Sequence, residues 1–578
     1  MTDSLRLLLE DFLGLMREEG ELDAFLPLLM SSMGHEVVYR PQKGPRQYGV
    51  DIVSVGKDAD GVRKLFIWLV KCGDIGRTDW NSGPQSVRQS MDDIRDVYLA
   101  SHVAPEHKAL KKRVLIVTNG DFRANLNETI ALFLTKWSRE TKVQTEQVNG
   151  SKLAAWTEKW LLDEYILPTS NRALLRRMLA NANTPDLCVQ VGEALVDSML
   201  DSALAPASSH GARTKRLLTG LRGIRTALNV LHVWATNENN LLGPYILSRY
   251  AVLATWARLH ERLKVADSDA SREFGGLLFQ LASIAKAYHQ RLDAYYHVQD
   301  AFAHVLPDSL LVSRTVFDEL GRLGQQGCFW AFHGAVAGRS DFSVYAFEYS
   351  ARIRALLQTH KCSALPAFDY HAANIHTALL LLVATGNENE ARSWVRRISQ
   401  RMYYATALRK YLPMSATFDD AILVRHGYEE VSAEFQPAST LLPVLLTWTA
   451  VLGMDDSYEF LRADVLPKMK STTPNFWSSE HGYDGTVSDA RSMHEHGIGE
   501  TILDIPDEPH EFLRQMSVGL EGVEHIEQSS WYQAPAPYIP ILAAMHWQAQ
   551  IPREMIVQQA MAFAGVELAP STEEESES

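Results

Sequence analysis

The chain has 578 residues, of which 46% are hydrophobic and 22% are charged, and its net charge at pH 7 is −14. This length exceeds what one hydrophobic core supports, so we expect two or three domains. The acidic balance argues against a protein that coats nucleic acid or anionic membrane by bulk charge, so any nucleic-acid site must be a local patch.

The cysteines and the apolar segments indicate where the protein resides. Its four cysteines are scattered without a CxxC pair, which indicates neither a zinc site nor a disulfide framework. Residues 441–453 form the longest apolar window, which contains Pro443 and falls short of the roughly 20 residues that span a bilayer. Residues 1–21 are amphipathic and contain several acids, unlike a signal peptide. We therefore expect a cytoplasmic protein without a membrane partner.

Residues 22–167 alternate between helical and strand patterns. A first helix carries apolar residues on one face and ends at Gly34. Residues 36–72 then hold three β-branched and aromatic runs separated by Gly, Pro and Asp clusters, which predicts a meander of three strands. The other expected elements are a helix at 84–101, a buried parallel-type strand at 110–120, a helix at 127–141, a strand at 142–148 and a helix at 150–167.

Two charged residues interrupt the apolar strand patterns, Asp51 in GVDIVSV and Lys71 in LFIWLVK. A charge in such a place is unfavourable unless it is paired, hydrated or bound to a metal. The two residues are therefore either a structural ion pair between neighbouring strands or part of a functional site, and the residues alone leave both interpretations open.

The order helix, strand, strand, strand, together with these residues, resembles the PD-(D/E)XK nuclease superfamily. The resemblance is closest to its Mrr-type restriction endonuclease-like domain and covers about residues 22–160. The matching motifs are Asp23 on the first helix, Gly34-His35-Glu36-Val37, Gly49-Val50-Asp51-Ile52, Lys71, the strand from Arg113 to Phe122, and Val148-Asn149-Gly150-Ser151-Lys152-Leu153.

This resemblance implies a fold and a set of roles for named residues. Residues 1–167 would form an α/β restriction endonuclease-like domain, a mixed sheet flanked by helices. Asp51 and Asp23 would hold Mg²⁺ or Mn²⁺, and Lys71 would position or activate the attacking water. Gln85 and Arg88 lie where members of the superfamily often place residues near the nucleic acid, although solvated residues in the first turn of a helix are the structural alternative.

The chain departs from the superfamily at the residue two before the lysine. That residue is Glu, Asp or Gln in the family, but here it is Leu69, which cannot bind a cation. Strand alternation would point this position and the lysine toward the same metal. A migrated acid, from Asp74, Asp79 or Glu36, would be needed to add a ligand.

From residue 170 to about 565 the sequence predicts an all-α region of one or more domains, without a convincing strand. Three stretches have the form helix, glycine, short polar turn, helix, with turns at Gly338, Gly386 and Gly453. They loosely resemble tetratricopeptide-type hairpins without a fixed period, so we expect a divergent solenoid or a plain helical array. Residues 480–510 predict a long irregular loop, and residues 566–578 predict a disordered acidic tail.

Two basic helical segments stand out from the acidic background. Residues 210–226 and residues 392–411 each carry five or more basic residues and no acid. In the second segment, Arg396, Arg397 and Arg401 line a helix face that could track phosphates, beside aromatic residues that could stack on bases. A solvated basic face that pairs with acids on neighbouring helices is the structural alternative.

Two functions from different classes follow. The first is a nuclease-derived effector that acts on DNA, in the setting of bacterial restriction or anti-phage defence that the resemblance implies, with the helical region binding a partner or nucleic acid. The second is a catalytically inactive nuclease fold that serves as a DNA-binding or protein-interaction scaffold, which Leu69 favours. The chain has no phosphate-binding loop of its own, so a nucleotide-driven motor would come from a partner protein such as an ATPase. Whether the protein forms a homo-oligomer stays open.

Overall fold

The computed structural model contains two compact units. The first comprises Met1–Ala251 and Arg272–Leu277, and the second comprises Val252–Ser271 and Leu278–Ser578. The described residues are 6, 9–10, 12–14, 16–39, 48–83, 86–160, 169–263, 268–408, 412–415, 417–428, 435, 437–469, 472–479, 484, 487, 497–502, 504–517, 528–534 and 536–566. Gln85 and residues 567–578 of the predicted acidic tail therefore lie outside the described residues.

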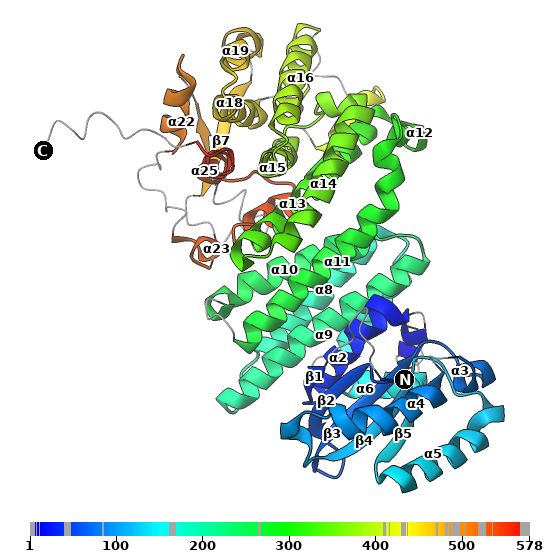
Figure 1. The fold of residues 1–578 in the computed structure, drawn as a ribbon. Helices are drawn as coiled ribbons and strands as arrows, with labels where there is room; N and C mark the ends of the chain where they lie inside the picture. Colours follow the sequence, from blue (N-terminus) through cyan, green and yellow to red (C-terminus); the bar gives the residue numbers. More distant parts are fainter. Residues whose placement is uncertain are drawn as a thin grey trace, which may run out of the picture. The chain divides into compact units, whose positions relative to one another are not determined.

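The first unit is built around a five-stranded mixed sheet near the N-terminus (Figure 1). Its strands are β1 (Glu36–Tyr39), β2 (Ile52–Lys57), β3 (Arg63–Lys71), β4 (Lys111–Thr118) and β5 (Gln144–Val148), and they lie side by side in that order. The pairs β1–β2 and β2–β3 are antiparallel, whereas β3–β4 and β4–β5 are parallel. The predicted three-strand meander and the predicted parallel strand are thus confirmed.

Helices surround the sheet and continue after it, so that an α/β region is followed by helices (Figure 1). They are the π-helices η1 (Glu18–Leu22) and η2 (Ile94–His102), the 3₁₀-helices η3 (Pro105–His107) and η4 (Ala124–Leu126), and α2 (Asp23–Ser32), α3 (Arg77–Asn81), α4 (Val87–Asp93), α5 (Asn127–Thr141), α6 (Gly150–Trp160), α7 (Thr169–Ala180), α8 (Pro185–Leu204), α9 (His210–Asn237), α10 (Leu242–Leu263) and α11 (Asp269–His297). The last two helices continue into the second unit.

One face of the sheet packs against α4 and α5. Alternate residues of neighbouring strands point to the same face, and Val53 of β2 and Leu69 of β3 join Met91 of α4 and Trp137 of α5 in one apolar cluster. Each of these four side chains is at most 2% exposed. Burying a large apolar side chain contributes about 1.5–3 kcal/mol, so this layer holds α4 and α5 on the sheet.

The opposite face of the sheet packs against α2 and α6 and contains a buried polar group. The Ser54 hydroxyl lies 3.2 Å from Nδ1 of His35 and accepts a hydrogen bond of 2.9 Å from Nε1 of Trp68. Trp68 also contacts Trp156 of α6 edge to face. A Cβ at Gly56 would collide with the His35 ring, so this position needs glycine.

Helix α9 contains the first of the two predicted basic segments, and part of its charge is paired within the first unit. Glu273 accepts hydrogen bonds from Arg222 at 2.6 Å and from Arg225 at 2.8 Å. Arg222 also donates to the backbone oxygen of Ser31 at the end of α2. These two arginines therefore connect α9 to its neighbours. This agrees with the structural alternative, in which basic residues of this segment pair with acids on neighbouring helices.

The second unit is largely helical. Its elements are α12 (Ala301–Val305), α13 (Ser309–Ala337), α14 (Ser340–Thr359), η5 (Lys361–Ala364), α15 (His371–Ala384), α16 (Glu388–Ala407), α17 (Phe418–Arg425), α18 (Leu441–Val451), α19 (Asp455–Glu459), η7 (Phe460–Val465), η8 (Leu466–Lys468), α22 (Pro509–Ser517), α23 (Ser530–Gln533), α24 (Ile539–Trp547) and α25 (Arg553–Ala564). Across the described part of both units, no helix combines the length and apolar character needed to cross a bilayer.

The three predicted helical hairpins are present. Gly338, Gly386 and Gly453 directly follow or nearly follow α13, α15 and α18, and have φ angles of 62°, 71° and 61°. Glycine reaches this left-handed conformation without the steric penalty of a Cβ, so each residue ends one helix and lets the next begin. The sequence pattern located these turns correctly.

A small sheet in the second unit corrects the prediction of an all-α region. Its strands are β6 (Ala438–Ser439), β7 (Thr473–Ser479) and β8 (Gly497–Thr501), with β6–β7 parallel and β7–β8 antiparallel. Strand β8 lies within residues 480–510, for which the sequence predicted an irregular loop. The glycines of β8 and the proline and asparagine of β7 have low strand propensity, so the pairing depends on the tertiary fold.

Candidate active site at the ends of β2 and β3

Asp51 lies directly before β2, where the chain enters the sheet. Its backbone N–H donates a hydrogen bond of 3.0 Å to the oxygen of Trp68. In return, the N–H of Val70 donates to Oδ2 of Asp51 at 2.7 Å. The carboxyl group thus accepts a hydrogen bond that a backbone carbonyl would otherwise accept. This bond fixes the carboxyl group at the end of the β2–β3 pair.

Lys71 is the last residue of β3 and lies on the same face of the sheet as Asp51. Strand alternation places Lys71 with Leu69 on β3, and Asp51 with Val53 on β2, and both Leu69 and Val53 belong to the cluster under α4 and α5. The resemblance required this arrangement. Both charged residues are half-buried, so neither is fully solvated.

The electrostatic environment brings two further acids to this position. Burial is the largest effect on Asp51 and raises its pKa to about 6 from an ordinary value of 3.8. The Val70 N–H and the positive charge of Lys71 lower this pKa, whereas the negative charges of Glu18 and Asp23 raise it. The charges of Lys71, Glu18 and Asp23 therefore all act on the Asp51 carboxyl group.

Glu18 is the functional candidate that the sequence interpretation missed. It begins η1, and the N–H of Asp23 donates to the oxygen of Glu18 five residues earlier. This i→i+5 turn brings Glu18 and Asp23 closer to one face than the α-helical repeat would, and such π-turns are frequent at functional sites. The acidic run EEGE before the first helix was the signal available in the sequence.

Asn119 fixes the segment that leads into Glu18. Its side-chain amide donates to the backbone oxygens of Leu13 at 2.7 Å and Met16 at 2.9 Å, and its Oδ1 accepts from the N–H of Gly73 at 2.7 Å. Asn119 is 3% exposed and follows β4 directly. The N-terminal segment is therefore held against the ends of β3 and β4.

Leu69 is the residue at which the sequence resemblance would place a second metal-binding acid. Its side chain is 1% exposed and belongs to the apolar cluster, so it faces the same side as Lys71 but offers no oxygen. The strand register assumed from the sequence is correct. The absence of an acid here therefore reflects the identity of this residue and not a shift of the strand.

The three acids considered as migrated ligands have structural partners instead. Oδ1 of Asp74 accepts from the N–H of Asp121 at 2.9 Å, and Oδ2 of Asp79 accepts from the N–H of Gly76 at the start of α3. Glu36 forms an ion pair of 3.3 Å with Arg63 at the surface. Each of these acids therefore has a local structural partner.

The donor chemistry near Asp51 fits a hard divalent cation, because carboxylate oxygens are the ligands that Mg²⁺ and Mn²⁺ prefer. Asp51 would be the first ligand, and Asp23 and Glu18 would supply further oxygens. Among the described residues, however, no group of three or more His, Cys, Asp or Glu side chains is arranged to hold a metal ion. The acids are close enough to influence the pKa of Asp51, but their side chains are not arranged as a set of metal ligands.

The predicted nucleic-acid contacts are distributed over both units. Arg88 is exposed in the first turn of α4, and its guanidinium lies 5.3 Å from the centre of the Phe133 ring. In the second unit, Arg396 and Arg401 are exposed on α16, as expected. Arg397 is instead half-buried and donates to the oxygen of Leu357, and burial lowers its pKa.

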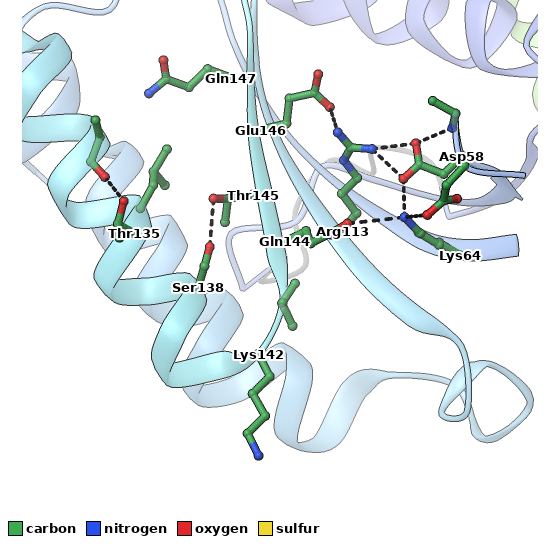
Figure 2. Close-up of a pocket in the computed structure, with 15 residues that line it drawn as sticks. Asp58, Lys64, Arg113, Thr135, Ser138, Lys142, Gln144, Thr145, Glu146 and Gln147 are labelled. Carbon is green, nitrogen blue, oxygen red and sulfur yellow. Dashed lines mark hydrogen bonds and ion pairs between the residues drawn. The ribbon is translucent and has the colours of Figure 1, made fainter. Parts of the chain in front are cut away.

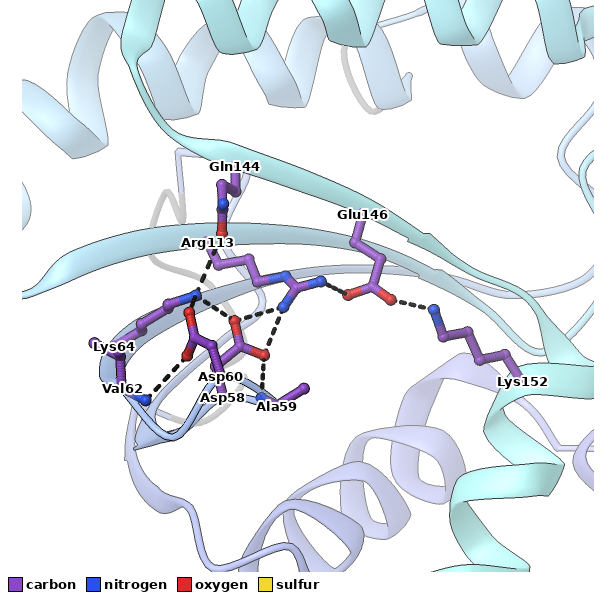
Figure 3. A network of polar contacts seen from close by, with 9 residues as sticks. All are labelled: Asp58, Ala59, Asp60, Val62, Lys64, Arg113, Gln144, Glu146 and Lys152. Atoms are coloured by element: carbon purple, nitrogen blue, oxygen red, sulfur yellow. Dashed lines mark hydrogen bonds and ion pairs between the residues drawn. The ribbon is translucent and has the colours of Figure 1, made fainter.

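A separate charged network lies at the other end of β2 and β3, roughly 23 Å from Asp51 along the strand. Figure 3 shows it running from Lys64 through Asp58 and Arg113 to Glu146 and Lys152. Asp58 lies 2.5 Å from Lys64 and 2.5 Å from Arg113, and Arg113 lies 2.6 Å from Glu146. Each charge has an opposite partner, as buried charges require.

This network borders an open groove of about 930 Å³ along the edge strand β5. In Figure 2 the groove has Thr135 and Ser138 of α5 on one side of β5 and the charged network on the other. Ser138 and Thr145 both line the groove, and their hydroxyls are hydrogen-bonded to each other at 3.0 Å. Asp58, Lys64, Arg113 and Glu146 compensate one another in this network, whereas Lys142 lines the groove as an exposed residue outside it.

No protein-family model, no curated protein and no solved structure matches this chain.

Proposed function

We propose that the first unit is a nuclease-derived domain that hydrolyses phosphodiester bonds in DNA. The observation that carries this proposal is the shared electrostatic site of Asp51, Lys71, Asp23 and Glu18 at the ends of β2 and β3. Perturbed carboxyl groups beside a specific charged partner are typical of functional sites. The sequence resemblance to the PD-(D/E)XK superfamily supplies the reaction class.

Each residue then has a role that its position supports. Asp51, held by the Val70 N–H, provides a fixed carboxylate at the strand end. Lys71 on the same face places a positive charge where a scissile phosphate or its attacking water would lie. Asp23 and Glu18 increase the negative potential that favours a divalent cation, and such a cation would neutralise phosphate charge and lower the pKa of bound water.

A second candidate is a catalytically inactive nuclease fold that binds DNA or a partner protein. Leu69 supports it, because this buried side chain replaces a metal ligand on the face that contains Asp51. In this case the site would keep its fold and its affinity for phosphate but lack turnover. Both candidates fit a cytoplasmic role in bacterial restriction or anti-phage defence, with the second unit binding a partner.

Cleavage assays with the full-length chain distinguish the two candidates. We expect supercoiled, linear or single-stranded DNA to be cut in the presence of Mg²⁺ or Mn²⁺, and Asp51→Ala and Lys71→Met to abolish the activity. Lys136→Met is the matched control, because Lys136 is 79% exposed in its side chain and lies on α5 away from the strand ends. Activity that persists in Asp51→Ala would reject this site as the catalytic centre.

Absence of cleavage needs a separate measurement of DNA binding. If the wild-type chain binds DNA, and Lys71→Met weakens the binding while Lys136→Met does not, the inactive-scaffold candidate is supported. If neither DNA binding nor cleavage occurs, the hydrolase and the DNA-binding form of the scaffold are both rejected, and only a scaffold that binds a partner protein is left. RNA substrates in parallel establish which nucleic acid the site prefers.

A further inference from the structure

An aromatic pocket lies on the same face of the sheet as Asp51. It has a volume of about 280 Å³, which is near the lower end of the range for small-molecule sites. Its lining consists of Val38, Tyr39, Tyr48, Val50, Val53, Leu65, Tyr98, His102, Ala104 and His107. Three tyrosines and two histidines thus surround a floor of aliphatic side chains.

The rings of this pocket are close to one another. The Tyr48 and His102 rings are 4.6 Å apart, and the Tyr98 and His102 rings are nearly parallel at 6.4 Å. Tyr98 and His102 belong to η2, which widens the helix at this position. Tyr48 has a φ of 50°, a left-handed conformation that is rare for a bulky residue and is typical of functional positions.

The polar groups of the pocket are available to a ligand. Among the described residues, the hydroxyls of Tyr39, Tyr48 and Tyr98 have no hydrogen-bond partner, although Tyr39 and Tyr98 pack against the apolar cluster. None of these three hydroxyls is a buried atom, so water hydrates them until a ligand binds. The pocket therefore combines flat apolar walls with unfilled donors and acceptors, as a heteroaromatic ligand requires.

The pocket is also next to the candidate active site along the chain. Val50 lines it and directly precedes Asp51, so the two backbone positions are about 3.8 Å apart. Val53 and Leu65 lie on the same sheet face as Asp51. A phosphate at Asp51 would thus place the adjoining sugar and base of the same strand within reach of the aromatic rings.

From this geometry we infer that the pocket binds one unstacked nucleobase of the strand whose phosphate lies at Asp51. The inference rests on the proposed function and adds the form of the substrate: a base that has left the duplex stack or belongs to a single strand. Aromatic side chains stack on bases of every sequence, and enzymes that read an extruded base use such pockets. The tyrosine hydroxyls would then contact the edge of the base.

Binding measurements without divalent metal test this inference separately from cleavage. The probes are an abasic single-stranded oligonucleotide and the same oligonucleotide carrying one base, each with a fluorescent label. We expect the full-length protein to bind the strand with one base about tenfold more tightly, as base stacking on aromatic residues predicts. The abasic strand reports the contribution of the phosphates alone.

Two variants change the pocket in opposite ways, so one misfolded protein cannot decide the result. Tyr48→Ala removes a wall, and Ala104→Trp fills the space; both should reduce the preference to less than about twofold and leave affinity for the abasic strand unchanged. Tyr428→Ala is the matched control, because Tyr428 is 79% exposed in the second unit. It should leave the preference intact.

The outcomes distinguish this inference from the proposed function. Equal affinity of the wild-type chain for both strands, or no affinity for either, overturns the base pocket. A preference that survives in both pocket variants also overturns it, since the base would then bind elsewhere. A preference that depends on the pocket, in a protein that cleaves no DNA with Mg²⁺ or Mn²⁺, supports the pocket and contradicts the hydrolase.

Discussion

Replacing Asp51 by Asn should stabilise the first unit at neutral pH, although it removes the central group of the candidate site. Burial raises the pKa of Asp51 to about 6, above its ordinary value of 3.8. The ionised carboxylate is therefore disfavoured in the folded state. Asn is neutral at every pH, and its Oδ1 can still accept the bond from the Val70 N–H.

The sign and size of the effect follow from proton linkage. Because the folded pKa is higher than the unfolded one, the folded state binds a proton more tightly, and stability falls as the pH rises from about 4 to about 6. A difference of about two pKa units costs the wild-type fold about 3 kcal/mol at about pH 7. At about pH 4.5 the cost is about 1 kcal/mol, so the gain from Asn should shrink accordingly.

A urea titration of the full-length chain at the two pH values measures this difference. Pulse hydrogen exchange should report the peptides that contain β2 and β3, because a chain with two compact units need not unfold in one step. Glu128→Gln is the control, since Glu128 is exposed on α5. Destabilisation by Asn at about pH 7, or an equal gain at both pH values, would refute the assigned environment of Asp51.

Three other substitutions probe the same domain. Burial alone would raise the pKa of Asp58, but hydrogen bonds led by the one from Lys64 lower it to about 2. The stability that the ionised Asp58 contributes is therefore present above about pH 4 and is lost as the pH falls toward 2. Asp58→Asn should cost about 2 kcal/mol of unfolding free energy at neutral pH in the same urea titration. Leu69→Glu should destabilise the fold in the absence of metal, because it buries a charge. Mn²⁺ should restore the lost stability, and electron paramagnetic resonance would detect its binding. If the substitution does not raise the affinity for Mn²⁺, the assigned ligand position is contradicted. Gly56→Ala should cost about 1–3 kcal/mol in urea unfolding, because the new Cβ meets the His35 ring, and an unchanged midpoint would show that the ring moves away freely.

The sequence predicts the central sheet well, because its strands are marked by uninterrupted apolar runs. Strand β3 is buried on both faces except at its ends, so Lys71 stands out as a charge that needs an explanation. Alternation within each strand, together with the register of the β2–β3 pair, gives the face shared by Asp51 and Lys71. Pattern therefore identifies the two residues at the centre of the candidate site.

Features that depend on tertiary contacts could not be predicted in this way. No residue type specifies the π-turn that brings Glu18 toward Asp23, and the pattern of apolar residues around it fits an ordinary helix equally well. The pairing of β7 with β8 joins two segments of low strand propensity across residues 480–496. Arg397 also looked like its exposed neighbours until packing against the segment that contains Leu357 covered it.

The position of the candidate site along the chain has a consequence for how the protein is made and controlled. Its charged groups lie between Glu18 and Lys71, and Asn119 closes the same end of the sheet by binding Leu13 and Met16, so residues 13–119 contain the whole site. N-terminal domains generally fold first during synthesis. This end of the sheet would thus be complete before most of the helical region leaves the ribosome. A signal received by that region would then regulate access to a finished site and not its construction.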